Sequence, residues 1–218
     1  MSNTTRTTFA AVTDGGLTEH RHLWLVRFVQ IFASYLPPNR SLLGPNRQNP
    51  RRSFPFYDDN SANPVKLLVA ASAGGHANDL TALLERAAEM WPEPPEVYVT
   101  TSTVRADKFR SEGMRVYVVR EADRRTPISA VVATVQTWRV VWRERPDAII
   151  TTGAMPMAIL CVWGRLAGAK IAWVDCLSQV DTLSLSGRAI RRLAHLTLTQ
   201  WPEVATRFRH VEYAGEVL

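Results

Sequence analysis

The sequence of 218 residues has few of the features that mark secreted, membrane-spanning or metal-binding proteins. It contains two cysteines, Cys161 and Cys176, without a Cys-x-x-Cys pair or a clustered histidine, so neither a disulfide framework nor a zinc site is indicated. No run reaches the roughly 18 apolar residues that span a bilayer. The N-terminal residues also lack the pattern of a secretion signal. We therefore expect a cytoplasmic protein in a reducing compartment.

The chain also lacks a large excess of either positive or negative charge. The net charge of +6, from 26 basic and 20 acidic residues, is spread along the whole chain. This balance is too even to indicate a nucleic-acid partner. Only three of the basic residues are lysines, and the preference for arginine either favours bidentate phosphate contacts or reflects a GC-rich genome.

Two common nucleotide-binding motifs are missing. The glycines in residues 72–76 do not form Gly-x-Gly-x-x-Gly, and residues 99–102 lack the acid that would hold a ribose, which argues against a dinucleotide. No lysine follows these glycines until Lys108, which argues against a P-loop. A Gly-x-Ser-x-Gly elbow is absent as well, so a Ser-His-Asp hydrolase is disfavoured.

Composition divides the chain in two. Residues 1–63, rich in Thr, Asn, Pro and Arg, are predicted to be a flexible leader. Its one ordered candidate is an amphipathic helix over residues 22–36, which suits either an anionic lipid surface or packing on a protein core. Residues 64–218 alternate β-rich runs with helical periodicity, which predicts one Rossmann-like α/β domain with a doubly wound parallel sheet. The predicted strands are 65–71, 96–100, 115–119, 148–152, 171–174, 196–200 and 211–213.

Helical periodicity also predicts which side chains face the core. A long helix begins after Thr126, a plausible N-cap followed by Pro127. Its apolar residues recur at helical spacing and are predicted to pack on the sheet. They are Ile128, Val131, Val132, Val135, Trp138 and Trp142. The next helix, over residues 155–167, is nearly all apolar and is expected to be buried on most sides.

Ligands of such sheets bind beyond the carboxyl ends of the strands, so the loops there hold the candidate site. Gly74 and Gly75 lie between the first strand and its helix, where main-chain N–H groups can approach a phosphate. Thr152 and Gly153 occupy the same position after the fourth strand. Two such loops at one crevice suggest a ligand that carries a diphosphate.

Several side chains at these loops are candidates for chemistry. His76 suits a general base towards a hydroxyl near neutral pH, with phosphate binding and a structural role in the loop as alternatives. Asp79 is a candidate to orient that imidazole or to hold a sugar hydroxyl, or is simply a favourable acid early in a helix. Asp175 and Ser178 follow the fifth strand and are candidates to select a sugar. The residues indicate no metal site.

Four blocks of sequence, in this order, resemble the acceptor-side subunit of split family-28-type glycosyltransferases. This family includes the membrane-anchoring subunit of the dolichol-linked chitobiose transferase of asparagine-linked glycosylation and bacterial exopolysaccharide relatives. The resemblance extends over about residues 65–218. The blocks are residues 69–76, 149–154, 173–187 and 198–202.

The resemblance implies the N-terminal half of a GT-B glycosyltransferase, which binds a polyprenyl-diphosphate-linked sugar acceptor. A separate donor-binding subunit would supply the UDP-sugar at the shared interface, for polysaccharide or lipid-linked oligosaccharide synthesis. It also implies that His76 and its two glycines form the acceptor-diphosphate loop. From the residues themselves we expect no cofactor and a protein that is peripheral on the cytoplasmic face of a membrane. The alternative is a non-catalytic scaffold that recruits the catalytic subunit to the membrane.

Overall fold

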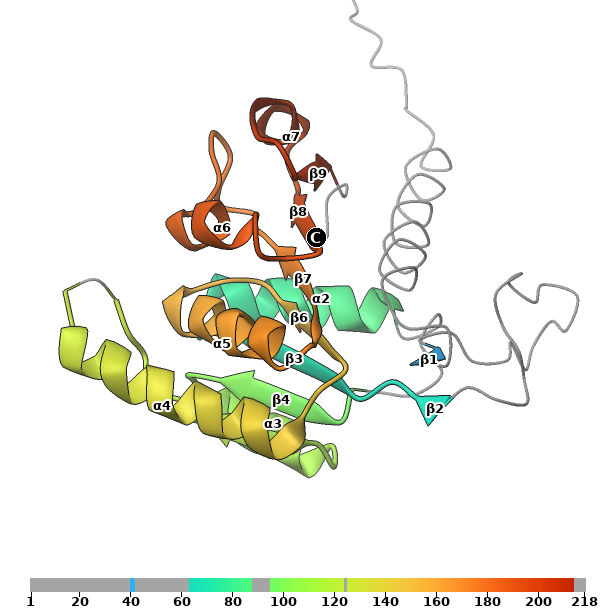
Figure 1. Cartoon of the computed structure of the whole chain (residues 1–218), viewed down its shortest axis with the longest axis vertical. Coiled ribbons are helices and arrows are strands. Elements are labelled where there is room, and N and C mark those ends of the chain that lie inside the picture. Colours follow the sequence, from blue (N-terminus) through green and yellow to red (C-terminus); the bar gives the residue numbers. More distant parts are fainter. Residues whose placement is uncertain (1–39, 42–62, 88–94, 124, 214–218) are drawn as a thin grey trace, which may run out of the picture.

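Seven parallel strands form the central sheet of the molecule (Figure 1). The computed structural model describes residues 40–41, 63–87, 95–123 and 125–213. The strands follow the order β5-β4-β3-β6-β7-β8-β9. Successive strands are added toward one side of β3 up to β5, and then toward its other side from β6 onward. The predicted doubly wound, Rossmann-like fold is therefore confirmed. The strands are β3 (Leu67–Ala71), β4 (Val97–Thr100), β5 (Arg115–Val118), β6 (Ala148–Thr151), β7 (Lys170–Val174), β8 (Leu196–Thr199) and β9 (Glu212–Tyr213).

Helices cover both faces of the sheet, which explains why β3, β4, β6 and β8 are buried at every residue. One core cluster joins the sheet to α2 (Gly75–Ala87) and α3 (Thr103–Ser111). The other joins it to α4 (Pro127–Glu144), α5 (Met155–Leu166) and α6 (Leu185–Ile190). A short helix that periodicity does not predict, α7 (Pro202–Arg207), precedes β9.

Little of the predicted leader is described. Arg40–Ser41 (β1) pairs in parallel with Asn63–Pro64 (β2), directly before the central sheet. The predicted helix over residues 22–36 lies outside the described residues. The proposed boundary between residues 63 and 64 falls within β2 and stays a prediction.

The predicted orientation of α4 is wrong. Of the six apolar residues expected to face the core, five are exposed and Val132 is half-buried. The buried face instead carries Ala133, Thr137, Val140, Val141 and Glu144. Its polar members are satisfied, since the Thr137 hydroxyl donates to the Ala133 carbonyl at 2.7 Å and Glu144 forms ion pairs. In α5, Val162 and Leu166 are also exposed, so that helix is less enclosed than its composition suggests.

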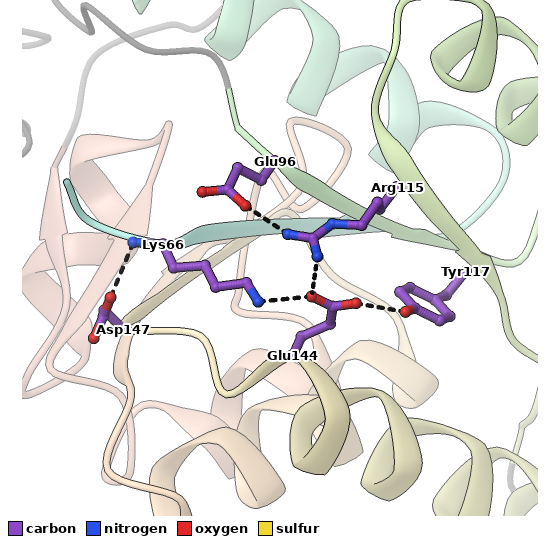
Figure 2. A network of polar contacts seen from close by, with 6 residues as sticks. All are labelled: Lys66, Glu96, Arg115, Tyr117, Glu144 and Asp147. Atoms are coloured by element: carbon purple, nitrogen blue, oxygen red, sulfur yellow. Dashed lines mark hydrogen bonds and ion pairs between the residues drawn. The ribbon is translucent and has the colours of Figure 1, made fainter.

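A polar network closes the edge of the sheet at the amino ends of the strands (Figure 2). The buried Glu144 carboxylate lies 2.8 Å from Nζ of Lys66 and 3.3 Å from a guanidinium nitrogen of Arg115, and it accepts the Tyr117 hydroxyl at 2.5 Å. Burial tends to raise the pKa of Glu144, but these partners together outweigh burial and lower it. The network fixes the end of α4 against β3 and β5.

Candidate functional site

The four sequence blocks meet at the opposite edge, where β3, β6, β7 and β8 end. The loops after β3 and β6 lead into α2 and α5, so two helix N-termini follow neighbouring strands. The loops after β7 and β8 are joined to each other. Nε1 of Trp201 donates to the Leu177 carbonyl at 2.8 Å, and Nε2 of Gln200 donates to the Asp175 carbonyl at 3.4 Å.

His76, in the first turn of α2, is fixed by two hydrogen bonds to Thr152. Its Nδ1 lies 2.8 Å from the Thr152 carbonyl oxygen, and the Thr152 hydroxyl donates to the His76 carbonyl at 2.5 Å. Because a carbonyl oxygen only accepts, Nδ1 carries a proton, and in the neutral ring Nε2 holds the lone pair. The structure thus brings together two of the predicted site residues and orients the imidazole.

Because Gly153 has no side chain, the His76 ring can occupy the space beside it. Its φ is +131°, and a Cβ there would lie 2.6 Å from Cε1 and 2.7 Å from Nδ1 of His76. Gly74 also has a positive φ, +79°, but nothing lies within 4 Å of its Cβ position. Gly74 and Gly75 are exposed, so the start of α2 is open to solvent. Phosphate binding at these glycines stays a prediction.

Cys176, directly after Asp175, is the third neighbour of the His76 ring. A hydrogen bond with the Cys176 side chain raises the pKa of His76 above its ordinary value, although partial burial opposes the rise. The Thr152 carbonyl and the nearby Asp79 carboxylate act in the same direction as Cys176. The exposed Ser178 donates its hydroxyl to Sγ of Cys176 at 3.3 Å, which places it at the same site.

The two predicted acids are buried and bound by this chain. Oδ2 of Asp79 accepts the amide of Leu177 at 3.3 Å, and so links α2 to the loop after β7. Oδ1 of Asp175 accepts Nε1 of Trp173 at 3.1 Å and the Ser184 hydroxyl at 2.6 Å, while Oδ2 accepts the Ser184 amide at 2.8 Å. Both carboxylates therefore organise the loop that precedes α6. Their contact with a sugar stays a prediction.

Two residues that the sequence analysis does not assign to the site also lie there. Arg105, near the start of α3, donates to Oδ1 of Asn78 and, at 3.4 Å, to the Thr81 hydroxyl, both on α2. Its guanidinium group therefore lies beside the first turns of α2. The sequence feature that could have indicated Arg105 as a site residue is its position shortly after β4, at the same edge of the sheet. Cys176, the other missed residue, occurs within the third block of the resemblance.

Other kinds of site have no support in the described residues. These residues include no cluster of three or more His, Cys, Asp or Glu side chains that would hold a metal ion. In the part of the chain that the structure describes, every helix is too short or too polar to cross a bilayer.

Comparison with known proteins identifies relatives that match about half of the chain or more. The "UDP-N-acetylglucosamine transferase subunit ALG14" of Mus musculus is 24% identical over 206 residues, which are 82% of this chain and 89% of the mouse protein. The corresponding subunit of Schizosaccharomyces pombe is 31% identical over 111 residues, covering 47% of this chain and 53% of the yeast protein.

A solved structure and a family model complete the comparison. MurG of Acinetobacter baumannii has a similar fold, with a TM-score of 0.54 and 14% identity over 68% of this chain. This chain spans only 45% of the MurG chain. Residues 67–217 match the model of the family described as "Oligosaccharide biosynthesis protein Alg14 like". Because this match includes every strand of the central sheet and all four site loops, the chain belongs to the family of Alg14-like oligosaccharide biosynthesis proteins.

Proposed function

We propose that this chain is the acceptor-binding subunit of a two-component glycosyltransferase that builds a lipid-linked oligosaccharide. The curated relatives are subunits of a UDP-N-acetylglucosamine transferase, which supports UDP-N-acetylglucosamine as the donor sugar. Both relatives are named as subunits, which supports a separate donor-binding partner. The acceptor is a sugar on a polyprenyl diphosphate, and the assembled enzyme works at the cytoplasmic face of a membrane.

The observation that carries this proposal is the position of His76 between two helix N-termini at one sheet edge. The first turns of α2 and α5 offer N–H groups and the positive ends of two helix dipoles, which suit a diphosphate. Arg105 adds a full positive charge beside α2. The acceptor diphosphate therefore binds at Gly74, Gly75 and Gly153, with its sugar above His76.

His76 is the general base of the proposed reaction. With Nδ1 donating to the Thr152 carbonyl, Nε2 takes the proton of the acceptor hydroxyl. The acceptor oxygen then bonds to the anomeric carbon of the donor sugar, whose bond to UDP breaks, and UDP leaves with the electron pair. Hydrogen bonding to Cys176 raises the pKa of His76, which makes its neutral imidazole a stronger base. Asp79 and Asp175 position the loop on which Cys176 and Ser178 lie.

The test is a transfer assay from radiolabelled UDP-N-acetylglucosamine to a detergent-dispersed polyprenyl-diphosphate sugar. This chain and its donor-subunit candidate are assayed alone and together, and we expect transfer only from the pair. In the pair, His76→Gln should lower kcat by about 100-fold or more, as for loss of a general base. The matched control is His210→Asn, since His210 is an exposed histidine near the amino end of β9.

Two results would contradict the proposal. Transfer by this chain alone would mean that one domain carries both sites. Near-normal transfer by the His76→Gln complex would favour the non-catalytic scaffold, in which His76 only shapes the loop. Arg105→Gln separates binding from chemistry, because losing a diphosphate contact should raise the KM for the acceptor more than it lowers kcat.

A further inference from the structure

The exposed face of α4 carries a continuous row of large apolar side chains. They are Ile128 (79% exposed), Val131 (64%), Val135 (40%), Trp138 (43%) and Trp142 (63%). Their spacing of three and four residues places them on one side of the helix. At 100° per residue, that side is opposite to the buried Ala133, Thr137 and Val141. We call these five residues the α4 stripe.

The neighbouring helix also exposes apolar side chains. Helix α5 packs beside α4, and Nε1 of Trp163 donates to the Thr134 carbonyl at 3.2 Å. Its own exposed apolar residues, Val162 and Leu166, lie one turn apart on its outer side. An apolar surface that crosses two helices is more than the scattered exposure of a soluble surface, and it marks a contact with another phase or molecule.

All exposed charges on these two helices are positive. Arg139 and Arg143 lie on α4, Arg145 caps its end, and Arg165 lies on α5. The one acid of either helix, both of which are described in full, is the buried Glu144 in the network of Figure 2. The apolar row is therefore flanked by positive charges and by no exposed acid of these two helices. Such a surface is complementary to a negatively charged one.

The tryptophans favour a lipid surface over a dry protein interface. The rings of Trp138 and Trp142 lie side by side, with centroids 6.3 Å apart and planes 27° apart. The Arg145 guanidinium lies 5.3 Å from the Trp142 ring centroid. Indole rings with adjacent arginines are typical of the headgroup region, where the ring is buried and the cation meets phosphate.

We propose that the α4 stripe, with Val162 and Leu166, lies on the surface of an anionic bilayer. This inference deepens the proposed function, from which it takes only that the acceptor is held in a membrane. Helix α4 follows β5 and runs back to the amino edge, so its first turn lies toward the edge that carries His76. Charges of both signs precede that end, namely Arg120, Glu121, Asp123 and Arg125, whereas the tryptophans lie in the second half of the helix. With α4 flat on the bilayer, the site faces along the membrane surface.

Vesicle binding of the full chain tests the proposal without donor or partner. Sedimentation is measured with vesicles of phosphatidylcholine alone and with phosphatidylglycerol added, and binding should require the anionic lipid. Arg139→Gln with Arg143→Gln should weaken binding by about fivefold per arginine. Trp138→Ser with Trp142→Ser should weaken it at least tenfold. The matched controls replace exposed residues elsewhere: Val104→Ser with Leu185→Ser, and Arg192→Gln with Arg209→Gln.

Fluorescence identifies the contacting helix. Brominated lipids should quench the tryptophan emission of the full chain, and Trp138→Phe with Trp142→Phe should remove most of that quenching while binding persists. Unchanged quenching, or stripe variants that bind like the controls, would overturn the proposal. A dimer that becomes monomeric on Trp138→Ser with Trp142→Ser, without a change in vesicle binding, would assign the stripe to a second copy instead. Failure of the proposed chemistry is separate, because His76→Gln should leave vesicle binding unchanged.

Discussion

The fit between Gly153 and His76 gives a sharp prediction for Gly153→Ala. The new methyl group would lie 2.6 Å from Cε1 of His76, so the ring has to leave its position. We expect overpacking to cost about 1–3 kcal/mol. The φ of +131° adds backbone strain of about 1–3 kcal/mol. Gly74→Ala is the matched control, because its φ of +79° is also strained while its Cβ meets nothing within 4 Å.

Urea unfolding and NMR titration of His76 would measure the two consequences. Gly153→Ala should lose about 1–3 kcal/mol more of the free energy of unfolding than Gly74→Ala, since the two variants differ mainly by overpacking. The pKa of His76 should fall towards its ordinary value in Gly153→Ala alone, because the displaced ring loses Cys176 and the Thr152 carbonyl. Equal losses in the two variants, with an unchanged His76 titration, would refute the assigned packing.

Three further substitutions test the electrostatics of the fold. Asp79→Asn keeps an acceptor for the Leu177 amide, so thermal stability should be unchanged. It removes a negative charge near His76, so the pKa of His76 should fall. An unchanged NMR titration of His76 would contradict this. Glu144→Gln should cost about 2–3 kcal/mol at pH 7, measured by urea unfolding, because hydrogen bonds to a charged group are lost. Burial and the charges of Lys170 and Arg165 lower the pKa of His195 to about 4, so protonation favours the unfolded chain: stability should decline as pH falls from about 6.5 towards 4. His195→Asn should flatten that decline in urea midpoints, and an identical pH dependence would rule His195 out as its source.

The strands were predictable because parallel strands buried on both faces consist of continuous apolar runs. Residues 67–71 and 148–150 are such runs, and each is followed by a glycine-containing loop. Helix α7 gave a weaker signal, because six residues are too few for periodicity and only Pro202 marks its start. Helix α4 shows a different limit. Periodicity identifies the residues that share a side of the helix, but not which side the sheet covers when the covered side carries Ala133, Thr137 and Glu144.

The candidate site was predictable in outline, because topology alone brings the carboxyl ends of parallel strands to one edge. The partners of each side chain were not. The two hydrogen bonds between His76 and Thr152 join residues 76 positions apart, and the Asp79–Leu177 bond joins residues 98 apart. Arg105 approaches α2 from α3 only because β4 lies next to β3. Such pairings depend on strand order, which local patterns in the chain do not contain.

The buried acids suggest how the candidate site stays formed within this chain alone. The loop after β7 carries Cys176 to the His76 ring, and it is held from three directions. Asp79 binds its Leu177 amide from α2, Trp201 binds the Leu177 carbonyl from the loop after β8, and Asp175 ties its start to the first residues before α6. Each restraint comes from this chain and each involves a buried or half-buried group, so the loop has little freedom to lose on binding a ligand. Preorganisation of this kind explains why the acids at this edge bind main-chain amides, and it leaves the helix N-termini, His76 and Arg105 as the groups available to the proposed acceptor diphosphate.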